Sequence, residues 1–68
     1  MKIKYNENWQ IIKTVTIYTT REDYEFELTE QEATSVINQF LDWRFIKIVD
    51  TDWTYYINVQ QVINIDVE

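Results

Sequence analysis

The sequence contains no glycine, no proline, no cysteine and no histidine. Without cysteine there are no disulfides, and without histidine as well nearly every zinc or transition-metal site is excluded. Loops that bind phosphate groups depend on glycine, so the common nucleotide-binding motifs are excluded too. We therefore expect no metal and no cofactor, and we expect stability to come from packing or from self-association.

The residues left for catalysis form no convincing site. Nucleophilic chemistry would fall to Ser35, a threonine or a lysine, but Ser35 lies within a predicted helix and has no basic partner in the pattern. The pairs Glu25/Glu27 and Asp50/Asp52 are spaced as neighbours on one strand face, roughly 6.6 Å apart and open to solvent. The turn at Asp50 also lacks the glycine and the distal glutamate of a calcium loop. We predict that the protein is not an enzyme.

Long apolar runs are absent as well. Nothing approaches the roughly 20 apolar residues of a membrane-spanning helix, and the start, MKIKYNENW, lacks the apolar core of a signal peptide. The formal net charge of −6 repels nucleic acid and anionic membrane surfaces. The sequence therefore predicts a cytoplasmic protein whose partner is another protein or a second copy of itself, without direct binding of nucleic acid or membrane.

The composition also bears on the origin of the chain. Isoleucine, asparagine, lysine, threonine and tyrosine are plentiful, whereas Ala33 is the only alanine. These frequent residue types are encoded mostly by AT-rich codons. The hypothesis that follows is an origin in an AT-rich genome, such as that of a low-GC bacterium or one of its phages or mobile elements.

With 68 residues, the chain has room for a single domain, residues 1–68. A domain of this size buries only about 60% of the surface that its unfolded form exposes, so an unusually dense core or a partner is needed. Eleven aromatic residues, among them Trp9, Trp43 and Trp53, are available for such a core. We expect Trp53 to lie in it.

Strand patterns dominate the sequence on both sides of one helix. Residues 2–5 predict a short first strand, residues 10–19 a second rich in β-branched side chains, and residues 24–29 a third in which Tyr24, Phe26 and Leu28 face inward while Glu25 and Glu27 face outward. Further strands are predicted over residues 44–50, 53–59 and 62–67.

The helix has the clearest local signal. Thr29 and Glu32 form a capping box, with Leu28 and Ala33 placed for a hydrophobic staple. The helix is predicted to end near residue 42 or 43. Its apolar stripe comprises Ala33, Val36, Ile37, Phe40 and Leu41.

These elements predict an α+β fold of the order β-β-β-α-β-β-β. We expect an antiparallel sheet of five or six strands with the helix packed on one face. Several strands are apolar on both faces, so the second face must either be buried by curling of the sheet toward a half-barrel or meet another molecule. The size of the chain favours the second alternative.

Two candidate surfaces follow. The leading hypothesis is a non-enzymatic interaction module that binds itself, as a homodimer, or a protein partner through an uncovered aromatic sheet face. The alternative is an acidic inhibitor that mimics nucleic acid and blocks a protein that binds DNA or RNA, because residues 21–32 carry a net charge of −5. The aromatic surface is assigned to Tyr18, Trp43 and Tyr56, and the acidic strip to Glu22, Asp23, Glu25, Glu27, Glu30 and Glu32.

Overall fold

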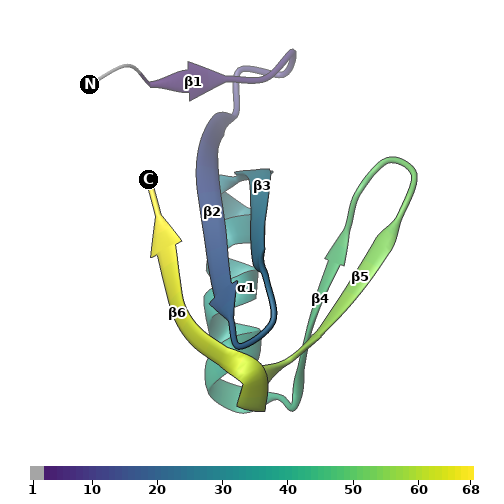
Figure 1. The fold of residues 1–68 in the computed structure, drawn as a ribbon. Coiled ribbons are helices and arrows are strands. Elements are labelled where there is room, and N and C mark those ends of the chain that lie inside the picture. Colours follow the sequence, from purple (N-terminus) through teal and green to yellow (C-terminus); the bar gives the residue numbers. More distant parts are fainter. Residues whose placement is uncertain (1–2) are drawn as a thin grey trace.

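The computed structural model describes residues 3–68 and has one helix and six strands (Figure 1). The predicted α+β order is confirmed, and so are the antiparallel pairings. Lys2, which the sequence placed in the first strand, lies outside the described residues. The elements are β1 (Lys4–Tyr5), β2 (Ile11–Thr19), β3 (Asp23–Thr29), α1 (Glu30–Asp42), β4 (Phe45–Val49), β5 (Thr54–Asn58), a short 3-10 helix (Val59–Gln61) and β6 (Val62–Val67).

The strands are divided between two sheets, where the sequence suggested one. The long strand β2 is central to the first sheet, with β3 on one edge and both β1 and β6 on the other. The second sheet is the β4–β5 hairpin, which Figure 1 shows set apart from the first. The two sheets do not close into a barrel, so the half-barrel alternative does not account for their second faces.

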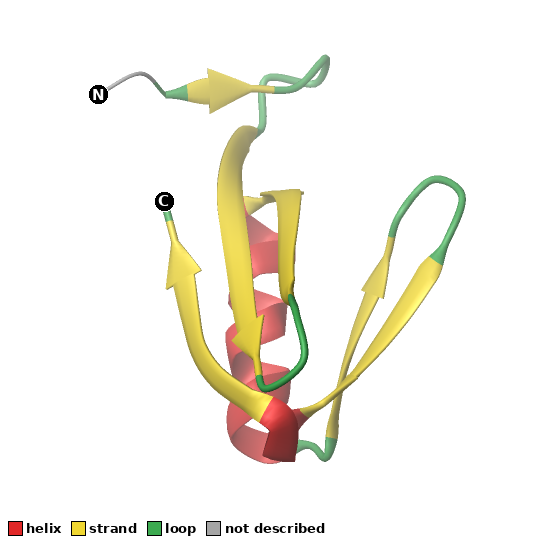
Figure 2. Cartoon of the chain, viewed as in Figure 1, coloured by secondary structure: helices red, strands yellow, loops and turns green. Residues whose placement is uncertain are grey.

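Helix α1 begins as the sequence predicts. The Thr29 side chain accepts a hydrogen bond from the Glu32 backbone N–H at 3.2 Å, and the Glu32 carboxylate accepts one from the Thr29 N–H at 2.8 Å. Leu28 and Ala33, the two members of the predicted staple, are both buried. The helix ends at Asp42 with Trp43 as its C-cap. It lies behind β2 and β3 in the view of Figure 2.

The core is formed where the two sheets and the helix meet. Its centre lies on the inner face of β2, where Val15 and Ile17 are fully buried. The Tyr55 ring of the hairpin packs edge-on against Phe26, with their centroids 5.0 Å apart. The remaining buried apolar residues are Phe26, Leu28, Ala33, Val36, Ile46, Ile48 and Ile57.

Polar side chains take the place of glycine and proline in the turns. The Asn6 carboxamide oxygen accepts from the N–H groups of Asn8 and Gln10, and the Thr19 hydroxyl organises the β2–β3 turn by donating to the Glu22 carbonyl at 2.6 Å. Asp50 accepts from the Thr51 N–H at the hairpin tip. Such side-chain turns are the usual alternative where glycine is missing.

The expectation that Trp53 lies in the core is wrong, and the other two tryptophans are exposed as well. Trp9, Trp43 and Trp53 are 81%, 71% and 67% exposed. Each lies just outside a regular element: Trp9 in the turn before β2, Trp43 at the end of α1, and Trp53 in the turn before β5. The alternation that assigned Trp53 to the core holds only within a strand, and β5 begins one residue later, at Thr54.

Leu41 is the second departure from the predicted core, since its side chain is 71% exposed. With about 100° of rotation per residue, Leu41 lies about 90° from the mean direction of Ala33, Val36, Ile37 and Phe40. It therefore lies at the margin of the apolar stripe, in the last turn of α1, where no strand covers it.

Candidate interaction surfaces

The outer face of the β4–β5 hairpin carries several exposed apolar side chains. The register pairs Lys47 with Tyr56, and the same face carries Phe45 and Val49. Tyr56 is 65% exposed and Val49 62%, while the alternate residues Ile46, Ile48 and Ile57 are buried on the inner face. We call Phe45, Lys47, Val49 and Tyr56, with the adjacent Trp43, the hairpin face.

Trp43 extends this surface at the base of the hairpin. Together with Phe45, Asn58 and Val59 it lines a hollow, and the Val59 N–H donates to the Arg44 carbonyl at 2.9 Å to close the base. The structure thus places Tyr56 on the hairpin and Trp43 beside the base of that hairpin, as the C-cap of α1. Phe45 and Val49 were not among the residues predicted for this surface. Their alternation with Ile46 and Ile48 along the strand does indicate that the two pairs lie on opposite faces.

Tyr18 does not belong to the hairpin face. It lies on β2, half-buried on the outer face of the first sheet, where its neighbours are Asp23 of β3 and Asn64 of β6. Three residues were assigned to an aromatic surface. Tyr18 lies on the first sheet, whereas Trp43 and Tyr56 lie beside and on the second.

Carboxylates flank the outer face of the first sheet on two sides. Glu27 and Glu25 of β3 pair with Thr14 and Thr16 of β2, and on the opposite edge of β2 Asp66 pairs with Thr16. Glu68 exchanges two backbone hydrogen bonds with Thr14, both 2.9 Å, so its side chain belongs to the same face. The residues that we call the acidic face are Asp23, Glu25, Glu27, Asp66 and Glu68.

The charge of this face affects the groups within it. Partial burial, followed by the negative charges of Asp66, Asp23 and Glu68, raises the pKa of the Tyr18 hydroxyl. The Lys4 ammonium donates to the Glu27 carboxylate at 2.9 Å, and this hydrogen bond and charge raise the pKa of Lys4. Both side chains of that ion pair are more than half exposed, so it contributes little to stability.

The predicted acidic strip is divided by the structure. Asp23, Glu25 and Glu27 lie on the acidic face, whereas Glu22 is in the turn, where it accepts from the Tyr24 hydroxyl at 2.6 Å. Glu30 and Glu32 are in the first turn of α1, and the Glu32 carboxylate is held in the capping box. Asp66 and Glu68 join the face only because β6 pairs with β2, a pairing that local sequence patterns do not specify.

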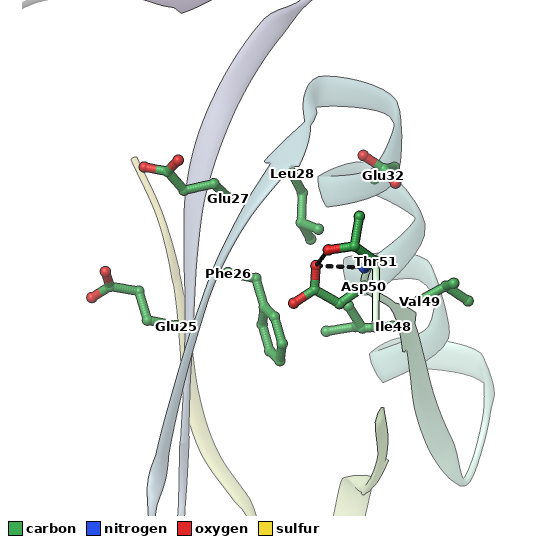
Figure 3. Close-up of a pocket in the computed structure, with 9 residues that line it drawn as sticks. All are labelled: Glu25, Phe26, Glu27, Leu28, Glu32, Ile48, Val49, Asp50 and Thr51. Carbon is green, nitrogen blue, oxygen red and sulfur yellow. Dashed lines mark hydrogen bonds between the residues drawn. The ribbon is translucent and has the colours of Figure 1, made fainter. Parts of the chain in front are cut away.

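A groove of about 430 Å³ lies on the other side of β3. Phe26 and Leu28 point into it from β3, and Ile48 and Asp50 line it from the hairpin. Glu25 and Glu27 line its β3 side, with their carboxylates directed away from Phe26 and Leu28 (Figure 3). Glu32 lines its helix side. The groove therefore runs along the edge of β3 that is not paired with β2.

At the free edge of β4, a side chain of α1 makes hydrogen bonds to the backbone. The Gln39 side chain accepts from the Lys47 N–H at 2.8 Å and donates to the Lys47 carbonyl at 3.3 Å. One carboxamide of α1 thus makes the two hydrogen bonds that a neighbouring strand would make at this position. This closes the middle of the β4 edge.

Comparison with known protein families, curated proteins and solved structures finds no match to this chain. Within residues 3–68, no helix combines the length and the apolar character needed to cross a membrane.

Proposed function

We propose that the protein is a small, non-enzymatic interaction module that forms a homodimer through the hairpin face. The observation that carries this proposal is the exposure of Trp43, Phe45, Val49 and Tyr56 around one hairpin whose other face is in the core. Contiguous exposed apolar surface of this kind usually marks an interaction site. Tyrosine and tryptophan suit such a site because each joins a large apolar area to one polar group.

The charges around the hairpin face favour a second copy as the occupant. Arg44 and Lys47 are balanced by Asp50 and Asp52 at the tip of the same hairpin, so two copies can meet there without a large excess of like charge. The acidic face offers no such balance. A dimer would also supply the additional burial that a 68-residue chain needs.

The test is the molar mass in solution by light scattering over a concentration series. Tyr56→Glu places a charge in the centre of the face and is expected to weaken dimerisation by at least about tenfold. Tyr5→Glu is the matched control, because Tyr5 is also exposed but lies on β1. A monomeric wild-type protein at all concentrations, or equal dimerisation by both variants, would contradict the proposal.

The acidic face supports a second candidate function, the inhibition of a nucleic-acid-binding protein by mimicry. The favouring observation is that Asp66 and Glu68 of the C-terminal segment add two carboxylates to those of β3 on one open sheet face. Binding that is lost when Glu25 and Glu27 are both changed to lysine, and that does not depend on Tyr56, would favour this candidate over the dimer.

A further inference from the structure

The free edge of β3 presents unpaired backbone groups. The Thr19 N–H donates to the Glu22 carbonyl at 3.1 Å, which fixes the phase of the β2–β3 ladder. Because hydrogen-bonded and non-bonded pairs alternate in an antiparallel ladder, Tyr24, Phe26 and Leu28 direct their backbone groups to β2. Asp23, Glu25 and Glu27 then direct theirs to the opposite edge, with which no strand pairs among the described residues.

A strand that adds to this edge would meet a different surface with each of its two faces. Residues opposite Asp23, Glu25 and Glu27 share their face, so their side chains meet carboxylates on the acidic face. The intervening residues point toward the groove, in which Phe26, Leu28 and Ile48 form the apolar part. Polar groups of Glu32, Asp50 and Thr51 complete its lining. Within the chain, Lys4 already makes such a contact between a lysine and a carboxylate of the acidic face, in its ion pair with Glu27.

A second copy of β3 does not fit the same edge. In a two-fold antiparallel pairing, outward-facing residues must oppose outward-facing residues, so Asp23, Glu25 and Glu27 would face one another. Like charges directly opposite each other destabilise a strand pair, and each chain carries a net charge of −6. The β3 edge therefore disfavours self-association and favours a basic partner.

We propose that the free edge of β3 binds an extended basic segment of another protein by antiparallel strand addition. The segment alternates lysine or arginine, facing Glu25 and its neighbours, with apolar or threonine side chains that face the groove. Backbone hydrogen bonds supply affinity, and the alternating side chains supply specificity. Val49 lines the groove and also belongs to the hairpin face, but strand addition at β3 does not require the proposed dimer.

The probe is a nine-residue peptide, KTKVKVKTK, with blocked ends. Its dissociation constant is measured by calorimetry with the wild-type protein and with Glu25→Lys. We expect Glu25→Lys to weaken binding by at least about tenfold through loss of an attraction and gain of a repulsion. Glu7→Lys, which makes the same charge change in the exposed β1–β2 turn, is the matched control and should change it by less than about twofold.

Two methylated peptides separate strand addition from simple charge attraction. Methylation of the lysine backbone nitrogens removes the donors that would face β3, whereas methylation of the threonine and valine nitrogens modifies the opposite edge. The first should abolish binding and the second should preserve it. Equal binding of the two, or no binding of the parent peptide, would overturn the proposal.

Hydrogen exchange gives an independent readout on the protein. In the free protein, the N–H groups of Asp23, Glu25 and Glu27 should exchange rapidly, and the peptide should protect them. Those of Tyr24, Phe26 and Leu28 should be protected in both states, because they face β2. The Tyr56→Glu variant should bind the peptide as the wild type does. Failure of the dimer therefore leaves this test intact.

Discussion

Trp9 holds a backbone conformation that usually belongs to glycine or asparagine. Its φ is 60°, the only positive value within residues 3–68, and its ring is exposed except for a tilted contact with Tyr5 at 6.2 Å. The left-handed conformation costs a bulky residue about 1–2 kcal/mol. Because the sequence contains no glycine, a residue with a Cβ atom occupies this turn position and bears that cost.

Trp9→Asn should therefore stabilise the protein, because asparagine tolerates the left-handed region. After the loss of the Tyr5 contact, we expect a gain of about 0.5–1 kcal/mol in the free energy of unfolding, measured by urea titration. Trp53→Asn is the control, since Trp53 is similarly exposed in a turn but has a negative φ. A larger loss of stability in Trp9→Asn than in the control would show that the aromatic contact outweighs the strain.

At the scale of single elements, the local sequence determines most of what is observed. The capping box, the end of α1 at Asp42, the strands β2 and β3, and β6 over Val62–Val67 agree with the prediction, because each depends on neighbours in the chain. What could not be predicted depends on pairing between distant segments. The placement of β6 beside β2 created the acidic face, and the separation of the hairpin from β3 created the groove.

Gln39 shows how a side chain can take part in a sheet. Gln39→Met keeps the length of the side chain but removes both hydrogen bonds to the Lys47 backbone. We expect a loss of about 1–2 kcal/mol in the free energy of unfolding. Gln31→Met, on an exposed position of the same helix, should change it by less than about 0.5 kcal/mol. Equal losses in both variants would contradict the role of Gln39 in closing the β4 edge.

At the scale of the whole molecule, charge and apolar surface are separated. Most of the negative charge that sets the value of −6 is in β3, the start of α1 and the C-terminal residues, whereas the hairpin carries balanced charges around its aromatic residues. Self-association is accordingly proposed at one sheet, and the binding of a basic segment at the edge of the other. The two events should then respond differently to salt.

Raising NaCl from about 0.1 M to about 1 M shortens the screening length from about 10 Å to about 3 Å. The dimer should be unchanged or tighter, because its contacts are apolar and the repulsion between two chains of charge −6 is screened. Binding of the KTKVKVKTK peptide should weaken by at least about tenfold, because it depends on attraction to Glu25 and its neighbours. Light scattering measures the first and calorimetry the second, with Tyr56→Glu as the protein for the peptide titration. A weakening of both events by the same factor would mean that dimerisation, like peptide binding, depends on attraction between opposite charges, and that the apolar hairpin face is not the dimer contact.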